Sequence, residues 1–237
     1  MTIARLQAIT SGIPTEKLNR IAQSHRPAPG RTALLVIDMQ HGFLDPGASL
    51  EVPKGREAIP NIQKLLGACR SAKMPVIFTE FVYSLAVPCL RGNPFGPEHL
   101  PASSGEPTGF GTPSANCLIG PGASDQTRES SATVDSLGPE SGELVLLAHT
   151  YDKFLGTPLE LALRSLGIDT LIATGVTTDV CVNSTIISGA NRNYHVIAAV
   201  DAMATIHDHI QTACFQIWAN KFARLMSSDE IVQEIQS

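Results

Sequence analysis

Two residues of this chain combine reactive side chains with positions that favour contact with a ligand: Asp38 and Cys181. Asp38 ends the apolar run in ALLVIDM, and a carboxylate at the end of a buried strand is costly unless it is paired or hydrogen-bonded. Cys181 follows the run TLIATGV and is predicted at the first turn of a helix. A helix N-terminus lowers the pKa of a thiol, and its amides can hold a developing oxyanion. The strand–turn–helix position therefore favours a chemical role for Cys181.

Both residues also have a simpler interpretation. Asp38 alone is typical of a helix or turn cap, and an isolated cysteine is usually a small buried side chain. Cys69 and Cys214 lie in helical patterns and receive that structural interpretation. The five cysteines are widely spaced and include no C-x-x-C pair. A disulfide framework, a structural zinc site and a thiol-dependent redox role are therefore disfavoured.

Other common site motifs are absent from the sequence. No strand end carries the phosphate-binding pattern G-x-x-x-x-G-K-[ST], the dinucleotide pattern G-x-G-x-x-G or the nucleophile elbow G-x-S-x-G. The net charge of −5 argues against nucleic acid and anionic membranes as partners. No apolar run approaches the roughly 20 residues that span a bilayer, and the N-terminus lacks an apolar signal core. We therefore expect a cytoplasmic protein.

Apolar runs rich in Val, Ile and Leu recur along the chain, which is typical of strands buried on both faces of a parallel sheet. Helical patterns separate most of them, and this alternation predicts right-handed β-α-β units. Ligands of such sheets bind outside the carboxyl ends of the strands. Strands are predicted at 33–39, 75–82, 143–149, 170–176, 195–203 and 222–228, and helices at 58–73, 157–167, 179–191 and 207–221.

Two segments fall outside this alternation. Residues 1–30, with a helical pattern at 13–25, are predicted to form an N-terminal helical extension of a domain at 31–237. Residues 84–142 are rich in Pro, Gly and Ser and are predicted to form a long insertion without a clear period. Its place after a strand end suits a lid or a partner arm, and a mobile surface loop is the alternative.

The stretches ALLVIDMQHGFLDPGASL, HTYDKFLGTPLEL and GVTTDVCV, in this order, resemble the isochorismatase-like cysteine hydrolases. The resemblance covers roughly residues 31–230 and is weakest in the insertion. It implies an α/β fold of three αβα layers around a six-stranded, mostly parallel sheet. The GVTTDVCV motif is most similar to those of the N-carbamoylsarcosine, ureidoacrylate and biuret amidohydrolases.

The resemblance also implies roles for individual residues. Asp38 would be the general base and Cys181 the nucleophile, which attacks an amide or ureide carbonyl to give a thioester that water then cleaves. A cis peptide bond is implied between Val176 and Thr177. The backbone N–H groups of Thr177 and Cys181 would form the oxyanion hole.

The lysine of the family's usual triad is missing from its expected position. The pattern places Ala148 there, and a methyl group can neither balance the charge of Asp38 nor bind a substrate. The chain is therefore expected to be an inactivated variant, with an engineered substitution favoured over a natural loss of activity. A third explanation is that Lys153 reaches in from five residues later, but a solvated loop lysine is the favoured interpretation of that residue.

The other polar residues narrow the branch of the family. The region after the second strand, FTEFVYSLAV, lacks the Asp-x-His motif of nicotinamidases, so neither a metal nor another cofactor is expected. Candidate substrate-binding residues are Gln40, Tyr151 and Thr177. His41 and His149 lie near strand ends and could serve substrate or structure, whereas Trp218 is expected in the core or at a subunit interface.

These observations predict a cysteine amidohydrolase that cleaves a C–N bond of a small carboxamide or carbamoyl (ureide) compound and releases ammonia or an amine. The alternative is a natural non-catalytic member of the same fold that binds or senses a ligand, which the missing lysine would permit. Because members of the family generally form dimers or tetramers, a homo-oligomer is expected.

Overall fold

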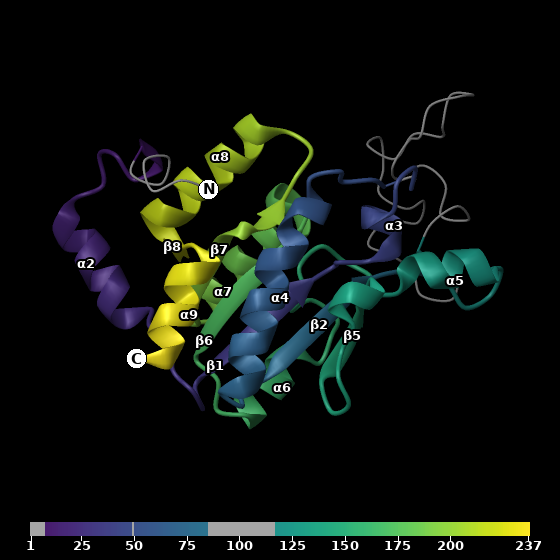
Figure 1. Ribbon diagram of the computed structural model, residues 1–237, viewed down its shortest axis with the longest axis horizontal. Helices are drawn as coiled ribbons and strands as arrows, with labels where there is room; N and C mark the ends of the chain where they lie inside the picture. The colour runs from purple at the N-terminus through teal and green to yellow at the C-terminus, as the bar shows by residue number, and fades with distance from the viewer. Residues whose placement is uncertain (1–7, 49, 85–116) are drawn as a thin grey trace.

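The protein is built around one parallel sheet of six strands, as the computed structural model shows for residues 8–48, 50–84 and 117–237 (Figure 1). The strand order is β5-β2-β1-β6-β7-β8, and every neighbouring pair is parallel. The predicted α/β fold with a six-stranded sheet is therefore confirmed. The strands are β1 (Thr32–Ile37), β2 (Val76–Phe81), β5 (Leu144–Ala148), β6 (Thr170–Val176), β7 (His195–Ala204) and β8 (Ala223–Met226).

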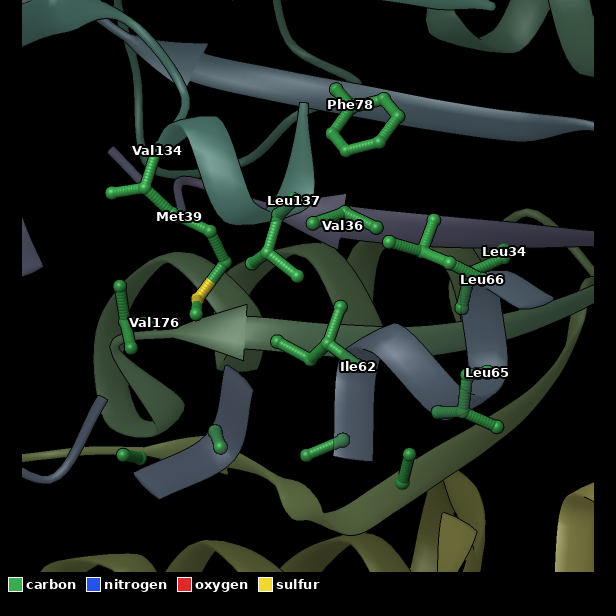
Figure 2. Packing of buried hydrophobic residues seen from close by; sticks show 14 of the residues in the cluster. Leu34, Val36, Met39, Ile62, Leu65, Leu66, Phe78, Val134, Leu137 and Val176 are labelled. Carbon is green, nitrogen blue, oxygen red and sulfur yellow. The ribbon is translucent and has the colours of Figure 1, made fainter. Parts of the chain in front are cut away.

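Helices cover both faces of the sheet and divide the core into two layers. On one face, α4 (Gly55–Ser71) lies across the sheet with α9 (Ser228–Gln236) beside it. Ile62 and Leu66 of α4 lie toward Leu34 and Val36 of β1, as Figure 2 shows, and Leu65 belongs to the same apolar cluster. The other face carries α6 (Leu159–Ser165), α7 (Asn183–Asn191) and α8 (Asp208–Lys221).

Several elements were missed from the sequence. The helix α9 begins with a capping box formed by Ser227 and Glu230, a local signal that was present in the sequence. The described part of the insertion predicted at 84–142 is not irregular, since it contains β4 (Leu118–Ile119), α5 (Asp125–Ser131) and a 3₁₀ turn at Asp135–Leu137. In addition, α3 (His41–Leu44) follows β1, and β3 (Tyr83–Ser84) pairs with β4.

The N-terminal helix predicted at 13–25 is present as α2 (Thr15–Ser24), and its C-terminal end is tied to β8 by a hydrogen bond from Arg224 to the carbonyl of His25. The division into an extension and a domain stays a prediction. Residues 1–7 of the extension and 85–116 of the insertion, including Cys89, lie outside the described residues. Among the helices that are described, none is long and apolar enough to cross a bilayer, and the cytoplasmic location stays a prediction.

The sheet places the predicted site residues at the carboxyl ends of its central strands. Because β1 lies between β2 and β6, the carboxyl ends of these three strands are neighbours. Asp38 directly follows β1, and the GVTTDVC turn begins at the end of β6. The close approach of β1 and β6 requires a glycine at 175, where φ is +111° and a Cβ would lie 2.0 Å from the carbonyl oxygen of Ile37.

We predict that Gly175→Ala destabilises the fold by about 3 kcal/mol or more, because the methyl group overlaps the backbone of Ile37 and the residue keeps a strained φ. Urea unfolding followed by circular dichroism measures the change. The matched control is Gly67→Ala in α4, where a Cβ meets no atom within 4 Å. This control should change stability by about 1 kcal/mol or less, in the stabilising direction. Equal stability of the two variants would contradict the close approach.

Candidate active site

Asp38 leaves β1 in an unusual conformation and is fully buried. Its φ of +54° is rare for a residue other than glycine, and such strain is concentrated at functional sites. Its N–H donates to the carbonyl of Thr79 at 3.0 Å, and the Thr79 hydroxyl donates to Asp38 Oδ1 at 2.7 Å. Two contacts with one residue of β2 therefore fix the direction of the carboxylate.

Lys153 supplies the charge that faces Asp38. Its side chain is completely buried, and Nζ lies 2.8 Å from Asp38 Oδ2 in an ion pair whose geometry is not that of an aligned hydrogen bond. The same ammonium donates to the carbonyl of Thr150 at 3.1 Å and lies 5.1 Å from the ring centroid of Phe81. The interpretation of Lys153 as a solvated loop lysine is wrong.

Asp38 has a cation partner although Ala148 stands at the position expected for the lysine. Ala148 is buried at the end of the edge strand β5, opposite Phe81 of β2, and its carbonyl accepts from the N–H of Val82. The chain turns after Ala148, and the ammonium of Lys153, five residues further along the chain, contacts Asp38. The expectation of an inactivated chain rested on a missing charge, and the ion pair removes its basis.

Cys181 lies in the first turns after β6, in a short π-helix, Thr178–Val182, that continues into α7. The thiol is 5% exposed. Burial raises the pKa of the Cys181 thiol well above its usual range. The ammonium of Lys153 lowers this pKa in part, and the carboxylate of Asp38 raises it further. The lowered thiol pKa that a helix N-terminus favours does not hold for the resting site, because lost hydration outweighs the effect of the Lys153 ammonium.

The turn before Cys181 has the backbone that the resemblance implied, with a cis peptide bond between Val176 and Thr177. The carbonyl of Thr177 accepts from the N–H groups of Val180 and Val182 at 3.2 and 3.1 Å. A backbone hydrogen bond with Thr177 also lowers the pKa of the Cys181 thiol. The turn thus holds the sulfur against backbone donors at the end of β6.

Gln40 was predicted to bind substrate, but its side chain is saturated by backbone groups. Its Nε2 donates to the carbonyls of Phe81 and Ser131 at 2.9 and 2.7 Å, and its Oε1 accepts from the N–H of Phe81 at 2.7 Å. The residue is fully buried. Gln40 therefore joins β2 to the end of α5, and the structure gives it a positioning role in the fold instead.

Aromatic side chains adjoin the ion pair. Tyr151 is partly buried and stacks on Phe81, with ring centroids 5.7 Å apart and planes 17° apart, while Tyr83 meets Phe81 edge to face. Tyr151 and Thr177, both partly exposed, remain candidate substrate contacts. His149 contacts the carbonyl of Val82 through Nδ1 at 3.1 Å.

Two further residues named from the sequence make contacts of their own. His41 contacts the carboxylate of Asp45. Trp218 is fully buried and donates to Asn183 Oδ1 at 2.8 Å, so the predicted core position is confirmed.

Comparison with known proteins shows the family of the chain. The isochorismatase domain model matches residues 32–230. The chain is 34% identical over 180 residues to ureidoacrylate amidohydrolase RutB of Methylobacterium radiotolerans, covering 73% of this chain and 67% of that protein. Among solved structures, a cysteine hydrolase from Pseudomonas syringae pv. phaseolicola is 26% identical with a TM-score of 0.70, covering 88% of this chain and 93% of the other. N-carbamoylsarcosine amidase from Thermoplasma acidophilum is 27% identical with a TM-score of 0.65, covering 85% and 98%.

We predict that Cys181 of the resting protein reacts slowly with iodoacetamide at pH 7 and faster as the pH rises above about 9, because only the thiolate reacts and burial raises the thiol pKa. Lys153→Met should move the profile to still higher pH, since the ammonium lowers this pKa. Mass spectrometry of the Cys181 peptide gives the rate. Lys64→Met, which removes a half-exposed lysine paired with Asp229, is the control and should leave the profile unchanged. A midpoint at or below that of a free cysteine would contradict the raised pKa.

Proposed function

The chain belongs to the isochorismatase domain family of hydrolases, and from this premise we propose that it is a cysteine amidohydrolase that cleaves a C–N bond of a small ureide or carboxamide. The observation that carries the proposal is the buried ion pair of Lys153 and Asp38, whose charges both act on the thiol of Cys181. A base, a cation and a nucleophile lie buried together at the carboxyl ends of parallel strands.

The first half of the reaction makes a thioester. Asp38 takes the proton of the Cys181 thiol as the sulfur attacks the carbonyl carbon of the substrate. The N–H groups of Thr177 and Cys181 stabilise the negative oxygen of the tetrahedral intermediate. The intermediate then collapses, the C–N bond breaks, and the proton held by Asp38 passes to the leaving nitrogen, so that ammonia or an amine departs.

The second half releases the acid. A water molecule loses a proton to Asp38 and attacks the thioester carbon. The C–S bond breaks, and the sulfur of Cys181 recovers its proton from Asp38. The raised thiol pKa fits this sequence, because the proton leaves the sulfur only as the C–S bond forms. Lys153 offsets the negative charge that moves between Asp38 and the sulfur. Without its ammonium, this charge would be buried with no cation beside it.

Two relatives support a narrower substrate class. Ureidoacrylate amidohydrolase and N-carbamoylsarcosine amidase are both named for compounds that carry a carbamoyl group on nitrogen. We infer that an N-carbamoyl compound is the preferred substrate of this chain and that the reaction uses no cofactor. The alternative of a non-catalytic member loses its main argument, because Lys153 supplies the cation that appeared to be missing.

The proposal is tested by ammonia release from a panel of N-carbamoyl compounds and primary amides. The unmodified protein should turn over at least one N-carbamoyl compound. Cys181→Ala, Asp38→Asn and Lys153→Met should each lower kcat by about 1,000-fold or more, because each removes a group that acts on the reacting atoms. Cys214→Ala, a buried cysteine of α8, and Lys64→Met are the controls and should keep activity. Equal activity of Cys181→Ala and the unmodified protein would exclude the mechanism.

The same assay decides which lysine position serves the site. Ala148→Lys adds a second cation at a fully buried position and should lower turnover. The double variant Lys153→Ala with Ala148→Lys should recover part of the activity that Lys153→Ala alone loses. If Ala148→Lys alone raises turnover above that of the unmodified protein, Lys153 is not the catalytic lysine and the interpretation of an inactivated chain is right.

We also propose that the protein forms a homo-oligomer, a dimer or tetramer. Large apolar side chains are exposed along the edge strand β5 and near α6, at Leu144, Val145, Leu147, Leu155, Leu161 and Leu166. Contiguous exposed apolar surface is a mark of protein interfaces. Light scattering at micromolar concentration should give a multiple of the mass of one chain, and Leu161→Glu should lower it. A monomer mass at all concentrations would disprove the assembly.

A further inference from the structure

The helix that follows Cys181 presents two hydroxyl groups to the loop that carries Lys153. Thr185 and Ser188 lie four and seven residues after Cys181, so all three side chains share one face of the helix. Each hydroxyl contacts the loop of residues 150–154, which we call the lysine loop. Hydrogen bonds from α7 therefore connect the segment of Cys181 to the lysine loop, in addition to the connection that the sheet provides.

Thr185 makes the more direct connection. Its hydroxyl donates to the carbonyl of Cys181 at 2.7 Å and accepts from the backbone N–H of Lys153 at 3.2 Å. The residue is 1% exposed. The N–H of Lys153 can only donate, so the single proton of the Thr185 hydroxyl is free for a carbonyl acceptor. The carbonyl of Cys181 is the nearer of two acceptors, since the carbonyl of Tyr151 lies 3.5 Å away. One buried atom thus joins the backbones of the nucleophile and the lysine.

A second connection lies one turn further along α7. The hydroxyl of Ser188 donates to Asp152 Oδ2 at 2.7 Å, and Asp152 Oδ1 accepts from the N–H of Phe154 at 2.9 Å. The residues on both sides of Lys153 are therefore fixed to the same helix. Within the loop, the hydroxyl of Thr150 donates to the carbonyl of Asp152 at 2.8 Å.

We propose that Thr185 is a positioning residue, which sets the place of the Lys153 ammonium relative to the Cys181 sulfur and Asp38. The inference rests on the proposed function. Lys153 is carried by a loop and lacks the ladder of hydrogen bonds that holds a strand residue. Two threonine hydroxyls hold its backbone instead: Thr157 donates to its carbonyl at 2.5 Å, and Thr185 accepts from its N–H and joins it to the helix of Cys181. Since catalysis depends on the reacting groups to within about 1 Å, losing the Thr185 contact should slow the chemical step more than it weakens substrate binding.

The test compares Thr185→Val, which keeps the shape but removes the hydroxyl, with Thr185→Ser, which keeps the hydroxyl. Thr185→Val should lower kcat about 10- to 100-fold and change KM by less than about 3-fold, because the N–H of Lys153 loses its link to the helix of Cys181 while the side chain at 185 keeps its shape. The midpoint of the iodoacetamide profile of Cys181 should rise by about half a pH unit or more, as the ammonium moves away from the sulfur. Thr185→Ser should stay within about 3-fold of the unmodified protein in kcat and share its alkylation midpoint.

Thr174→Val is the matched control, because it removes another fully buried threonine hydroxyl, which donates to the carbonyl of Leu35 at 2.8 Å. It should lower the melting temperature without moving the alkylation midpoint. The proposal is overturned if Thr185→Val changes only the melting temperature, or if Thr185→Ser loses as much activity as Thr185→Val. If Thr185→Val does not fold, Thr185→Ala is measured in its place with the same expected shifts.

The two readouts separate this inference from the proposed function. If the unmodified protein turns over no compound of the panel, the proposed function fails, and the alkylation midpoints of the Thr185 variants still decide whether Thr185 positions Lys153. If the unmodified protein is active and Thr185→Val is equally active with an unchanged midpoint, only the role of Thr185 is overturned.

Discussion

The ion pair between Asp38 and Lys153 is the constraint on which the site depends. Both side chains are fully buried, and the loss of hydration of two charges is repaid only by close attraction and further hydrogen bonds. Thr79 donates to the carboxylate, and the ammonium donates to the carbonyl of Thr150. Such a pair adds little to stability compared with packed apolar side chains, but losing one partner leaves a buried charge. Its presence beside a buried thiol therefore fits a functional requirement.

Three parts of the fold bring the ion pair and the thiol together. The strand β1 lies between β2 and β6, and Asp38 follows its carboxyl end. The glycine at 175 lets the turn before Cys181 approach the end of β1. The helix α7 holds the lysine loop through Thr185 and Ser188. Each contact joins segments that are far apart in the sequence, so the site exists only in the folded chain.

The burial that makes the ion pair necessary also controls the nucleophile. Lost hydration raises the pKa of the Cys181 thiol, while the nearby ammonium of Lys153 opposes that effect. The balance depends on distances between side chains and hence on how the lysine loop is held. A thiol that keeps its proton at rest is poorly reactive toward adventitious electrophiles, and a base next to it can still remove the proton during attack on a substrate.

Local patterns were enough to predict the parallel sheet, the places of Asp38 and Cys181 at strand ends and the family, because apolar periodicity and short motifs act over a few residues. The same reasoning missed α5 and α9, although the capping boxes at Ser124 and Ser227 were local signals for both. It could not place Lys153 or Gln40. Whether a loop lysine faces water or a buried carboxylate depends on how the chain turns after β5, and that turn is set by contacts with α7 more than thirty residues later. The saturation of Gln40 by Phe81 and Ser131 likewise arises only when three distant segments meet.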